Sequence, residues 1–308
     1  MAVEAFVGYP EWLFRLIRHP VVWFGALIDR LESGLNRKSW RFGVRRAAGA
    51  VAVLALVCLV AACALVMTGP PGLVAAYLVA CALPAQHSLW SHVRAVADGL
   101  EHEGLDGGRR AVAHIVGRDP ESLDEAGVVR AAVESLAENF SDGVVAPAFW
   151  GCVFGLPGML VYKAVNTADS MIGHRTKRYE AFGWAAARLD DLVNLPASRL
   201  AALWIVLAAC LRRDADPAEA IRAVLRDARR HRSPNAGWPE AAMAGALGLR
   251  LAGPRRYGGA LVEDAWMGQG RAAATVADLR AALGIYAVAC GIEWALVAAL
   301  AIWLNWPG

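Results

Sequence analysis

Long uncharged segments alternate with polar segments along this chain, and their lengths are those of membrane helices. No Asp, Glu, Lys or Arg lies between Arg46 and Arg94. Because one crossing needs about 20 apolar residues, we expect two membrane helices here, at 47–67 and 73–89, joined by a Gly/Pro-rich turn. A buried hairpin of a soluble protein is the alternative, and the length of the run disfavours it.

Three more apolar segments follow. Residues 143–162 are uncharged but contain two prolines and several glycines, so they form either a full crossing or a broken, re-entrant helix. Residues 200–210 are short for a crossing. Residues 281–306 contain one charged residue, Glu293, and carry tryptophans near their end, as is typical of the membrane interface. We therefore expect four or five membrane helices, one of them a candidate for a re-entrant segment.

The polar segments show helical rather than strand periodicity. Apolar residues recur at helical spacing over 12–17, where His19-Pro20 ends the first stripe, and again over 24–35. Similar spacing predicts helices within 91–142, with a turn at Gly107-Gly108. Strand-like alternation is nearly absent. We therefore predict an all-α, polytopic integral membrane protein with cytoplasmic helical insertions.

We expect one integral membrane domain over residues 1–308. Basic residues precede the first span and gather again after residue 211, and the positive-inside rule places both groups in the cytoplasm. The consecutive segments are an amphipathic entry at 1–46, a transmembrane hairpin at 47–90, a cytoplasmic helical insertion at 91–142, a polar membrane region at 143–211, cytoplasmic loop and helices at 212–280, and a C-terminal membrane helix at 281–306.

Composition supports this picture. The chain is 57% hydrophobic, with a mean hydropathy of +0.38, which is too apolar for an ordinary soluble domain. Its net charge of +3 is small, and the basic clusters flank membrane segments, so we expect no nucleic-acid partner. The N-terminus lacks the pattern of a cleavable signal peptide. All six cysteines lie in apolar runs without metal-ligand spacing, which is typical of small core residues.

Between residues 134 and 191, charged and amide side chains stand beside apolar segments, where burial is costly unless they are paired or bind a ligand. Glu134, Glu138 and Asp142 lie four residues apart and share one face if the helix persists to Asp142. Such carboxylates suit Mg²⁺, which proteins bind alongside substrate phosphates, and Asn139 adjoins them. A solvated acidic face is the alternative.

A second polar stripe follows at helical spacing. It offers Asp169 as a metal ligand, with Lys163 before it and Lys177 after it on the same side as phosphate-binding groups. Gly173 ends the stripe, and because it has no side chain it permits close approach of another group. The alternative is a polar seam that joins membrane helices through hydrogen bonds. The stripe consists of Asn166, Asp169, Ser170 and Gly173.

Two further groups complete the candidate set. Arg188 and Asp191 form either a local ion pair or part of the site. Because adjacent residues point to different helix faces, either Asp190 or Asp191 would join a given metal site, not both. The loop with Ser233 and Asn235 precedes a helix, an arrangement that can bind anions but is also common in loops without a ligand.

Acidic side chains, lysines and a small-residue loop favour nucleotide-dependent ligation, in which a carboxylate is activated by phosphoryl transfer. The chain has no GxxxxGK[ST] sequence, so any nucleotide site is not a P-loop. The residues alone predict a phosphate and metal site at the membrane surface and leave the substrate open.

Several ordered motifs resemble the CobD/CbiB family of cobalamin biosynthesis, the integral-membrane adenosylcobinamide-phosphate synthases. The longest lie at 134–150, 162–179, 182–192 and 233–239, and shorter ones extend the resemblance over nearly the whole chain. The shorter motifs are His19-Pro20-Val21, Ser88-Leu89 and His92 with Ala95-Val96, Val116-Gly117-Arg118-Asp119, and Gly253-Pro254 with Tyr257 and Gly259. The family often has Asp where Tyr9 stands and Tyr where His174 stands, so no N-terminal carboxylate role carries over, and His174 either tunes the local pH response or has no effect.

The resemblance implies amide formation between the free propionate of adenosylcobyric acid and aminopropanol or its O-phosphate. ATP is the implied co-substrate and Mg²⁺ the implied ion, and we hypothesise an acyl-phosphate intermediate. The corrinoid is a substrate rather than a cofactor. The resemblance also implies a multi-pass protein of the cell membrane, in contact with the lipid bilayer, with a cytoplasmic active site and other late cobalamin-pathway enzymes as partners.

We assign the expected roles as follows. The catalytic candidates are Glu134, Glu138, Asp142, Asp169 and Lys163. The candidate Mg²⁺ ligands are Glu138, Asp142 and Asp169. The candidates for binding substrate or phosphate are Asn139, Asn166, Ser170, Lys177, Arg188, Asp191, Ser233 and Asn235.

Two other functions stay open. A membrane prenyltransferase would hold Mg²⁺-diphosphate with helical aspartates, although this chain repeats the two-aspartate motif only in part. A transporter or binding module would line a path with the polar groups. Topology is open as well. A full crossing by residues 143–162 starts the Asp169 stripe on the non-cytoplasmic side, whereas a re-entrant segment lets all motifs meet near the cytoplasmic face.

Overall fold

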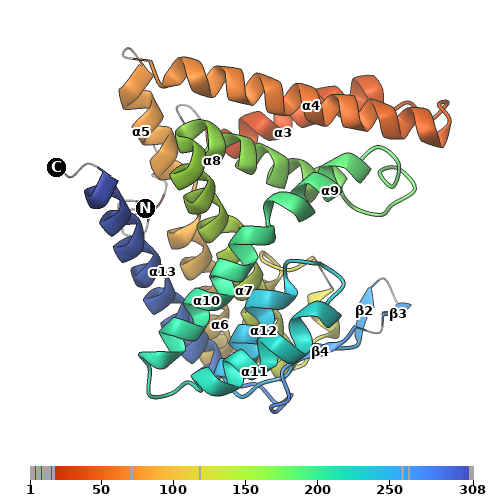
Figure 1. Ribbon diagram of the computed structural model, residues 1–308. Helices are drawn as coiled ribbons and strands as arrows, with labels where there is room; N and C mark the ends of the chain where they lie inside the picture. The colour runs from red at the N-terminus through yellow and green to blue at the C-terminus, as the bar shows by residue number, and fades with distance from the viewer. Residues whose placement is uncertain are drawn as a thin grey trace. The chain divides into compact units, whose positions relative to one another are not determined.

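The computed structural model describes residues 4, 8, 15, 18–69, 72–117, 119–257, 260–262 and 264–304. These residues fall into two units, and each unit is described by itself (Figure 1). The first unit draws on Met1–Ala85 and Ala146–Asn194, and the second on Gln86–Val145 and Leu195–Gly308. Nearly all of the regular structure is helical, as predicted.

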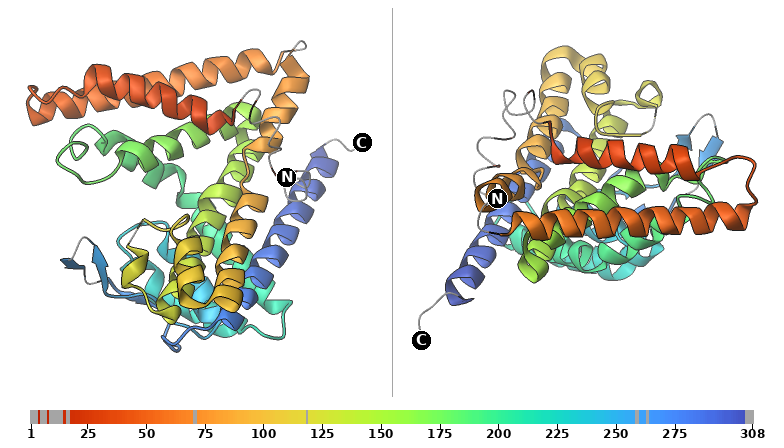
Figure 2. Two further views of the ribbon diagram at one scale, coloured as in Figure 1. Left: turned by 180° about the vertical axis from the view of Figure 1, so that it is seen from behind. Right: turned by 90° about the horizontal axis from the view of Figure 1, so that it is seen from above.

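A helical hairpin and three further helices build the described part of the first unit. α3 and α4 lie side by side in the view from above in Figure 2, α8 packs against both, and α9 packs against α4 and α8. Pro20 begins α3, and the His19 ring accepts a hydrogen bond from the Val21 amide at 3.3 Å, so a helix starts at the predicted break. The stripe predicted over 12–17 lies outside the described residues, apart from Arg15. The described helices of this unit are α3 (Pro20–Leu35), α4 (Phe42–Met67), α5 (Leu73–Ala82), α8 (Ala146–Ile172) and α9 (Trp184–Val193).

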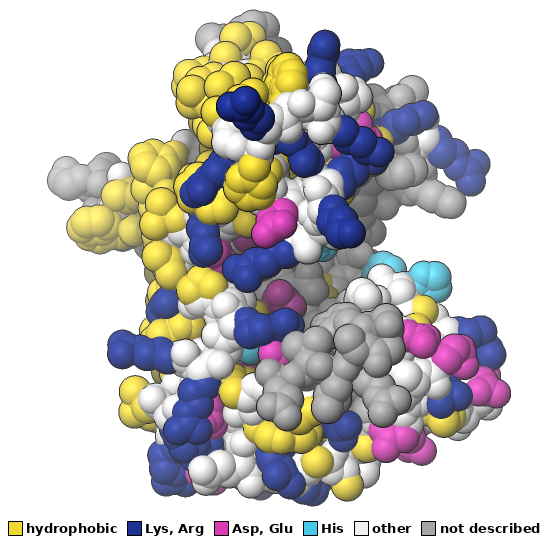
Figure 3. Space-filling view, turned by 90° about the vertical axis from the view of Figure 1, so that its right-hand side faces the viewer, with side chains coloured by type: hydrophobic (Ala, Val, Ile, Leu, Met, Phe, Trp, Pro, Cys, Tyr) yellow, Lys and Arg dark blue, Asp and Glu magenta, His cyan; other side chains and the backbone are white. Residues whose placement is uncertain are grey.

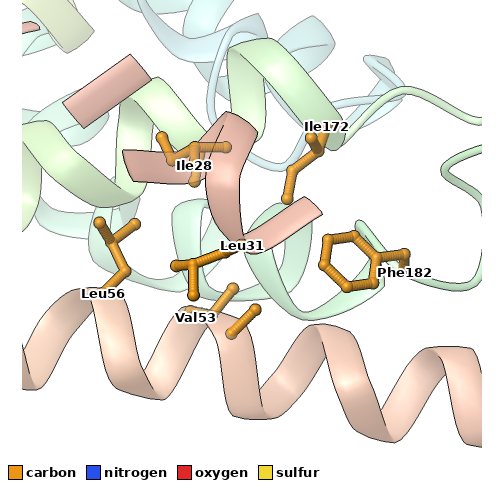
Figure 4. Close-up of a pocket in the computed structure, with 8 residues that line it drawn as sticks. Ile28, Leu31, Val53, Leu56, Ile172 and Phe182 are labelled. Carbon is orange, nitrogen blue, oxygen red and sulfur yellow. The ribbon is translucent and has the colours of Figure 1, made fainter. Parts of the chain in front are cut away.

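Apolar side chains of α3, α4 and α8 form the core of this unit. Ile28 and Leu31 of α3 lie with Val53 and Leu56 of α4 around a small cavity, and Phe182 reaches it from the segment between α8 and α9 (Figure 4). Leu56 and Phe182 are buried almost completely. The apolar stripe predicted for α3 therefore packs as expected, because its positions share one helix face.

The expected second membrane helix over 73–89 is wrong as one continuous helix. α5 ends at Ala82, and α6 begins only at Gln86. Pro84 lies in this gap, and proline neither donates the backbone hydrogen bond nor leaves room for the preceding turn. With 10 residues, α5 is shorter than a crossing requires.

Six helices dominate the described part of the second unit. α12 packs against α7, α10 and α11, while α6 packs against α7 and α13. The left view of Figure 2 shows α13 in dark blue beside α6. These helices are α6 (Gln86–Val112), α7 (Glu125–Phe140), α10 (Leu195–Cys210), α11 (Pro217–Asp227), α12 (Gly237–Ala246) and α13 (Val276–Leu304).

The turn expected at Gly107-Gly108 is wrong, because α6 continues through both glycines. The break in α6 is at Gly104, which has a φ of 67°. Gly107 instead permits close packing, since a Cβ there would lie 2.5 Å from the carbonyl oxygen of Gly99. The doublet therefore serves contact between the two halves of α6.

Two short ribbons are the strand structure that the sequence did not predict. β1 (Leu251–Ala252) pairs antiparallel with β4 (Trp266–Met267), and β2 (Arg255–Tyr257) pairs antiparallel with β3 (Ala260–Val262). The registers place Leu251 opposite Met267 and Arg256 opposite Leu261. Strands of two or three residues are too short to show a period of two.

Three described helical stretches are long and apolar enough to cross a membrane: α4, Glu125–Ile172 and α13. α9 and α10, if they form one broken span, would make a fourth. The stretch Glu125–Ile172 passes from α7 to α8 through a π-helical turn, Ser141–Val145, and α8 is kinked at Gly155. Of the two alternatives for residues 143–162, the kink at Gly155 supports the broken helix, and the predicted count of four or five crossings stays a prediction.

Basic side chains gather where α3 turns into α4. Figure 3 looks onto that end and shows many Lys and Arg side chains on the visible face. Arg178, from the segment between α8 and α9, donates to both Glu32 oxygens, at 2.9 and 2.6 Å. These bonds to Arg178 lower the pKa of the Glu32 carboxyl below its ordinary value. The contact ties α3 to the segment that leads into α9.

Candidate functional site

A buried carboxylate, Asp190, organises the polar contacts between α8 and α9. Its side chain accepts hydrogen bonds from the Asn166 amide at 3.3 Å and the Asn194 amide at 3.0 Å. The Asn194 side-chain oxygen in turn accepts the Tyr162 hydroxyl at 2.8 Å. Tyr162 and Asn166 are four residues apart, so one face of α8 presents both to α9. The network lies inside the first unit, between otherwise apolar helix surfaces.

Two more carboxylates lie near Asp190. Asp169, one turn after Asn166 and half-buried, lies close enough to both Asp190 and Asp191 for their charges to interact. Arg188 donates to Asp191 at 3.2 Å, so the local ion pair that was one of the two alternatives is present, and a role of the two residues in the site stays a prediction. Like charges at short range are unfavourable unless a cation or a proton joins them. This group of aspartates is therefore suited to hold a cation.

Gly173 makes close approach to Asp169 possible. The Gly173 amide donates to the Asp169 carbonyl oxygen at 2.7 Å. A Cβ at Gly173 would lie 1.9 Å from Asp169 Oδ1, a distance that no real contact tolerates. The prediction that this glycine permits close approach is confirmed.

One of the two lysines that flank the stripe lies differently from the expectation. Lys163 is half-buried on α8, one turn before Asn166. The Ser170 hydroxyl donates back to the Asn166 carbonyl oxygen at 3.0 Å. The expectation that Lys177 extends the same helical side is wrong, because α8 ends at Ile172, and Lys177 is exposed in the following segment.

The acidic residues of α7 and of the turn after it belong to the second unit, and they differ in burial and in backbone conformation. Glu134 is buried, and its carboxylate accepts the Ala252 amide of β1 at 2.9 Å. Glu138 is exposed. Asp142 lies in the π-helical turn, so the condition for one shared face, an α-helix that persists to Asp142, is not met. Asn139 donates to the Ser135 carbonyl oxygen at 2.9 Å.

The loop before α12 borders a pocket of about 360 Å³ within the second unit. Its basic and aromatic lining includes Arg199, Arg229 and Trp238. The Ser233 hydroxyl accepts the Asn235 and Ala236 amides, each at 3.2 Å. The expected helix follows this loop, beginning at Gly237.

Asn235 is turned inward rather than toward a ligand. Its side-chain oxygen accepts the Ser198 hydroxyl at 3.1 Å and the Arg199 guanidinium at 2.9 Å. Asn235 is buried, as is Ser198. The geometry thus makes Asn235 a residue that positions Arg199.

Within the described ranges, no three His, Cys, Asp or Glu side chains are arranged to hold a metal ion. Of the proposed Mg²⁺ ligands, Asp169 belongs to the first unit, and Glu138 and Asp142 belong to the second. Mg²⁺ is usually bound by one or two carboxylates with water and substrate phosphate oxygens. Asp169 together with Asp190 or Asp191 meets that requirement.

Sequence reasoning placed Asp191 rather than Asp190 in the candidate set, and it missed the arginines that the structure brings into the second group. Asp190, rather than Asp191, is the buried aspartate at the centre of the first group, and its spacing of four residues to Asn194 was the available signal. Arg199 and Arg229 had a weaker signal. An arginine at the start of an apolar run, such as Arg199, needs a polar partner. The partner in the structure, Asn235, lies 36 residues further along the chain, beyond the reach of local patterns.

The fold and the two polar groups define a helical protein with helices of membrane-spanning length and acidic and basic side chains held between them. The model of the CobD/Cbib protein family matches residues 1–286. The chain belongs to this family.

Curated relatives agree over nearly the whole length. The chain is 52% identical to "Cobalamin biosynthesis protein CobD" of a Sinorhizobium species, over 98% of this chain and 96% of that protein. It is 50% identical to the protein of that name from Rhodobacter capsulatus and 47% identical to the one from Brucella suis, each over 93% of this chain and 90% of the relative. No solved structure matches the chain.

Proposed function

We propose that this protein is a cobalamin-biosynthesis enzyme that joins an amino alcohol to a corrinoid. The substrate is the free propionate of adenosylcobyric acid, the amine is aminopropanol or its O-phosphate, and the product is adenosylcobinamide or its phosphate. The names of the relatives support the pathway. The reaction itself is our extension from the family resemblance.

The observation that carries the proposal is the group of aspartates around Asp190. An amide cannot form readily from a free carboxylate, so the propionate must first be activated. In the proposed reaction a propionate oxygen attacks the γ-phosphorus of ATP, and ADP leaves. The amine then attacks the acyl carbon, inorganic phosphate leaves, and the amine loses a proton. Bound Mg²⁺ would neutralise the phosphate charge.

The residues of the first unit support distinct roles in this scheme. Asp169, with Asp190 or Asp191, would hold Mg²⁺. Asn166 and Asn194 fix the Asp190 carboxylate through the hydrogen bonds described above. Lys163, on the same helix, would neutralise a phosphate or a propionate. The Ala252 amide bound by Glu134 supports a role for Glu134 in holding β1, and the roles of Glu138 and Asp142 as Mg²⁺ ligands stay predictions.

The proposal includes the cell membrane as the location. The helices of spanning length and the exposed leucines and valines along α4 support contact with lipid. The basic residues that precede α4 support a cytoplasmic position for that end of the helix. Other late enzymes of the pathway are proposed as partners.

The test is conversion by the purified full-length protein. Adenosylcobyric acid, Mg²⁺, ATP and aminopropanol phosphate are incubated with the enzyme, and the corrinoid mass is followed. The proposal requires a new amide that depends on ATP, with ADP as the coproduct. The variant Asp190→Asn should abolish conversion, whereas Asp214→Asn, an exposed aspartate paired with Arg212 in the second unit, should leave it intact. Diphosphate release from a prenyl donor, without amide formation, would instead indicate a prenyltransferase.

A further inference from the structure

The surface where α3 turns into α4 carries exposed cationic side chains from two separate stretches of the chain. One stretch precedes α4, and the other lies between α8 and α9. Hydrogen bonds join the two stretches, because the Asn36 side-chain amide, at 3.1 Å, and the Arg45 guanidinium both donate to the Arg178 carbonyl oxygen. Five exposed residues of the first unit form this basic rim: Arg37, Lys38, Arg41, Arg175 and Lys177.

Within the described ranges, no carboxylate neutralises the basic rim. None of its side chains forms an ion pair with an Asp or Glu side chain, and no acidic residue lies between Arg37 and Arg46. The buried carboxylate of this region, Glu32, is already occupied, since it accepts the Arg178 guanidinium and the Asn36 amide. The rim therefore presents positive charge that the described part of the protein leaves uncompensated, which suits an anionic partner.

An apolar strip begins beside the basic rim and runs along α4. Val44, Val51 and Leu65 recur at multiples of seven residues, so they share one helix face, and all three are exposed. The opposite side of α4 is buried in the core of the first unit. Because α4 is long and apolar enough to cross a membrane, its exposed strip is suited to contact acyl chains.

Aromatic side chains lie between the basic rim and the apolar strip. Phe42 begins α4 and is exposed, and Trp184 begins α9 and is exposed as well. The Arg46 guanidinium lies 3.6 Å from the Trp184 ring centre. Aromatic side chains at the end of a membrane helix are typical of the level of the lipid headgroups. The order of basic rim, aromatic residues and apolar strip is therefore that of lipid phosphate, interface and hydrocarbon.

We propose that the basic rim binds the headgroups of anionic phospholipids, with the apolar strip of α4 against their acyl chains. Clusters of about four to eight Lys and Arg beside a membrane helix attract anionic lipid surfaces. A small soluble anion fits less well, because the exposed charges would be screened from it. An acidic soluble protein would leave the adjoining apolar strip uncovered. The inference rests on α4 lying in the bilayer, and it does not depend on the reaction proposed above.

Lipid bound at the basic rim would stabilise the segment that leads into α9. Arg45 ties the start of α4 to Arg178 of that segment. Further along α4, Gly49 lets the Phe182 backbone approach, since a Cβ at Gly49 would lie 1.9 Å from the Phe182 carbonyl oxygen. A ligand that binds the folded state and not the unfolded state raises stability. Lipid binding should therefore appear as a higher melting temperature.

Thermal unfolding in detergent tests the proposal without any substrate. Purified full-length protein is mixed with phosphatidylglycerol or, at the same mole fraction, with zwitterionic phosphatidylcholine. The wild-type melting temperature should be higher in phosphatidylglycerol by about 2–4 °C or more. In the triple variant Arg37→Gln/Lys38→Gln/Arg41→Gln, which removes three of the five rim charges, this difference should fall to roughly half or less. In phosphatidylcholine the triple variant should melt within a few degrees of wild type, because its three substitutions break no ion pair among the described residues.

A matched control removes three positive charges elsewhere. The variant Arg94→Gln/Arg110→Gln/Arg213→Gln changes exposed arginines of the second unit and should keep the full difference between the two lipids. Salt provides a second test on the wild-type protein. Raising NaCl to about 0.5 M should reduce the difference, because the screening length becomes shorter.

Several outcomes would overturn the proposal. These are equal melting temperatures of wild type in the two lipids, an undiminished difference in the rim variant, a lost difference in the control variant, and a difference that salt leaves unchanged. Equal stabilisation by glycerol phosphate would indicate a small anion as the ligand instead. Equal stabilisation by polyglutamate would indicate an acidic protein.

The lipid site and the proposed reaction can fail separately. If phosphatidylglycerol stabilises the protein through the basic rim but no amide forms, the lipid site stands and the ligase function falls. If the amide forms while the two lipids give equal melting temperatures, the function stands and the lipid site falls.

Discussion

At the scale of single residues, the polar side chains of this protein divide into those that hold structure and those that are arranged for ligands. Glu134 and Asn235 are buried and turned toward protein partners, namely the Ala252 amide and the Arg199 guanidinium. Asp169 and Arg229 have charged neighbours of their own sign. Since like charges are costly at short range, the second kind is where a ligand gains most by binding.

Gly173→Ala tests whether the place of Asp169 matters for activity. The added Cβ would collide with Asp169 Oδ1 and with its carbonyl oxygen, so the carboxylate must move. We expect at least a tenfold loss in the rate of amide formation, on the order of 1.4 kcal/mol. The assay compares purified variants in the presence of Mg²⁺ and ATP.

Gly34→Ala is the matched control, because a Cβ at Gly34 meets nothing within 4 Å in the same unit. Wild-type rates in Gly173→Ala, with a correctly folded protein, would show that the position of Asp169 is not needed for the reaction.

At the residue scale the sequence allowed part of the site to be predicted. The i, i+3, i+4 spacing on α8 was sufficient to place Asn166 and Asp169 together. It could not show that Asp190, on another helix, lies at the centre of the network, because spacing carries no information about contacts between helices. The Arg199–Asn235 contact escaped prediction for the same reason.

At the scale of helices, glycine and proline residues break the apolar segments into shorter or kinked helices. α8 contains Gly155 with a φ of 64° and a ψ of −152°, a conformation open to glycine and unfavourable for other residues. Pro157 follows two residues later. The prolines and glycines of this region made a broken helix one of two alternatives, without its geometry. The break at Pro84 was overlooked because an uncharged run was treated as one helix.

Gly155→Ala should destabilise the protein by roughly 1–3 kcal/mol, the cost of a side chain in this backbone region. Thermal unfolding in detergent would measure it. Gly291→Ala in α13, where a Cβ meets nothing within 4 Å, should be neutral or slightly stabilising. A melting temperature that is equal or higher in Gly155→Ala would contradict the assigned kink.

The Glu32–Arg178 pair gives the first unit a pH-dependent stability. The pKa of Glu32 is lower in the folded protein, so the pair stabilises the fold above the ordinary carboxyl pKa, and this contribution is lost as the pH falls through the lowered folded value. At pH 7 the free energy of unfolding of wild type should exceed that of Glu32→Gln by roughly 1 kcal/mol, which thermal unfolding detects as a higher melting temperature. The two melting temperatures should converge in strong acid. A difference that grows as the pH falls would have the wrong sign.

At the scale of the whole molecule, the hydrophobic pattern predicted the helical class, and the order of motifs predicted the family, which the comparisons confirm. Membrane topology could not be predicted in the same way. The segment 143–162 is apolar enough to cross, yet it contains the kink, and hydropathy alone does not distinguish a crossing from a re-entrant helix.

Cysteine labelling tests the side of the membrane on which the polar groups lie. In a variant without the six native cysteines, Thr176→Cys and Ser233→Cys should both react with an impermeant maleimide from the cytoplasmic side. Thr176 is exposed in the segment after α8, and Ser233 borders the pocket beside the loop before α12. Labelling from opposite sides would exclude a single cytoplasmic active site.

The most direct test of the central claim is the mass of the corrinoid product. Purified protein, adenosylcobyric acid, aminopropanol phosphate, Mg²⁺ and ATP are combined, and the products are separated and weighed by mass spectrometry. The account predicts a corrinoid heavier by one aminopropanol phosphate less one water, formed together with ADP and lost in Asp190→Asn. A folded, substrate-binding protein that forms no such amide, or forms it equally well without ATP, would contradict the account.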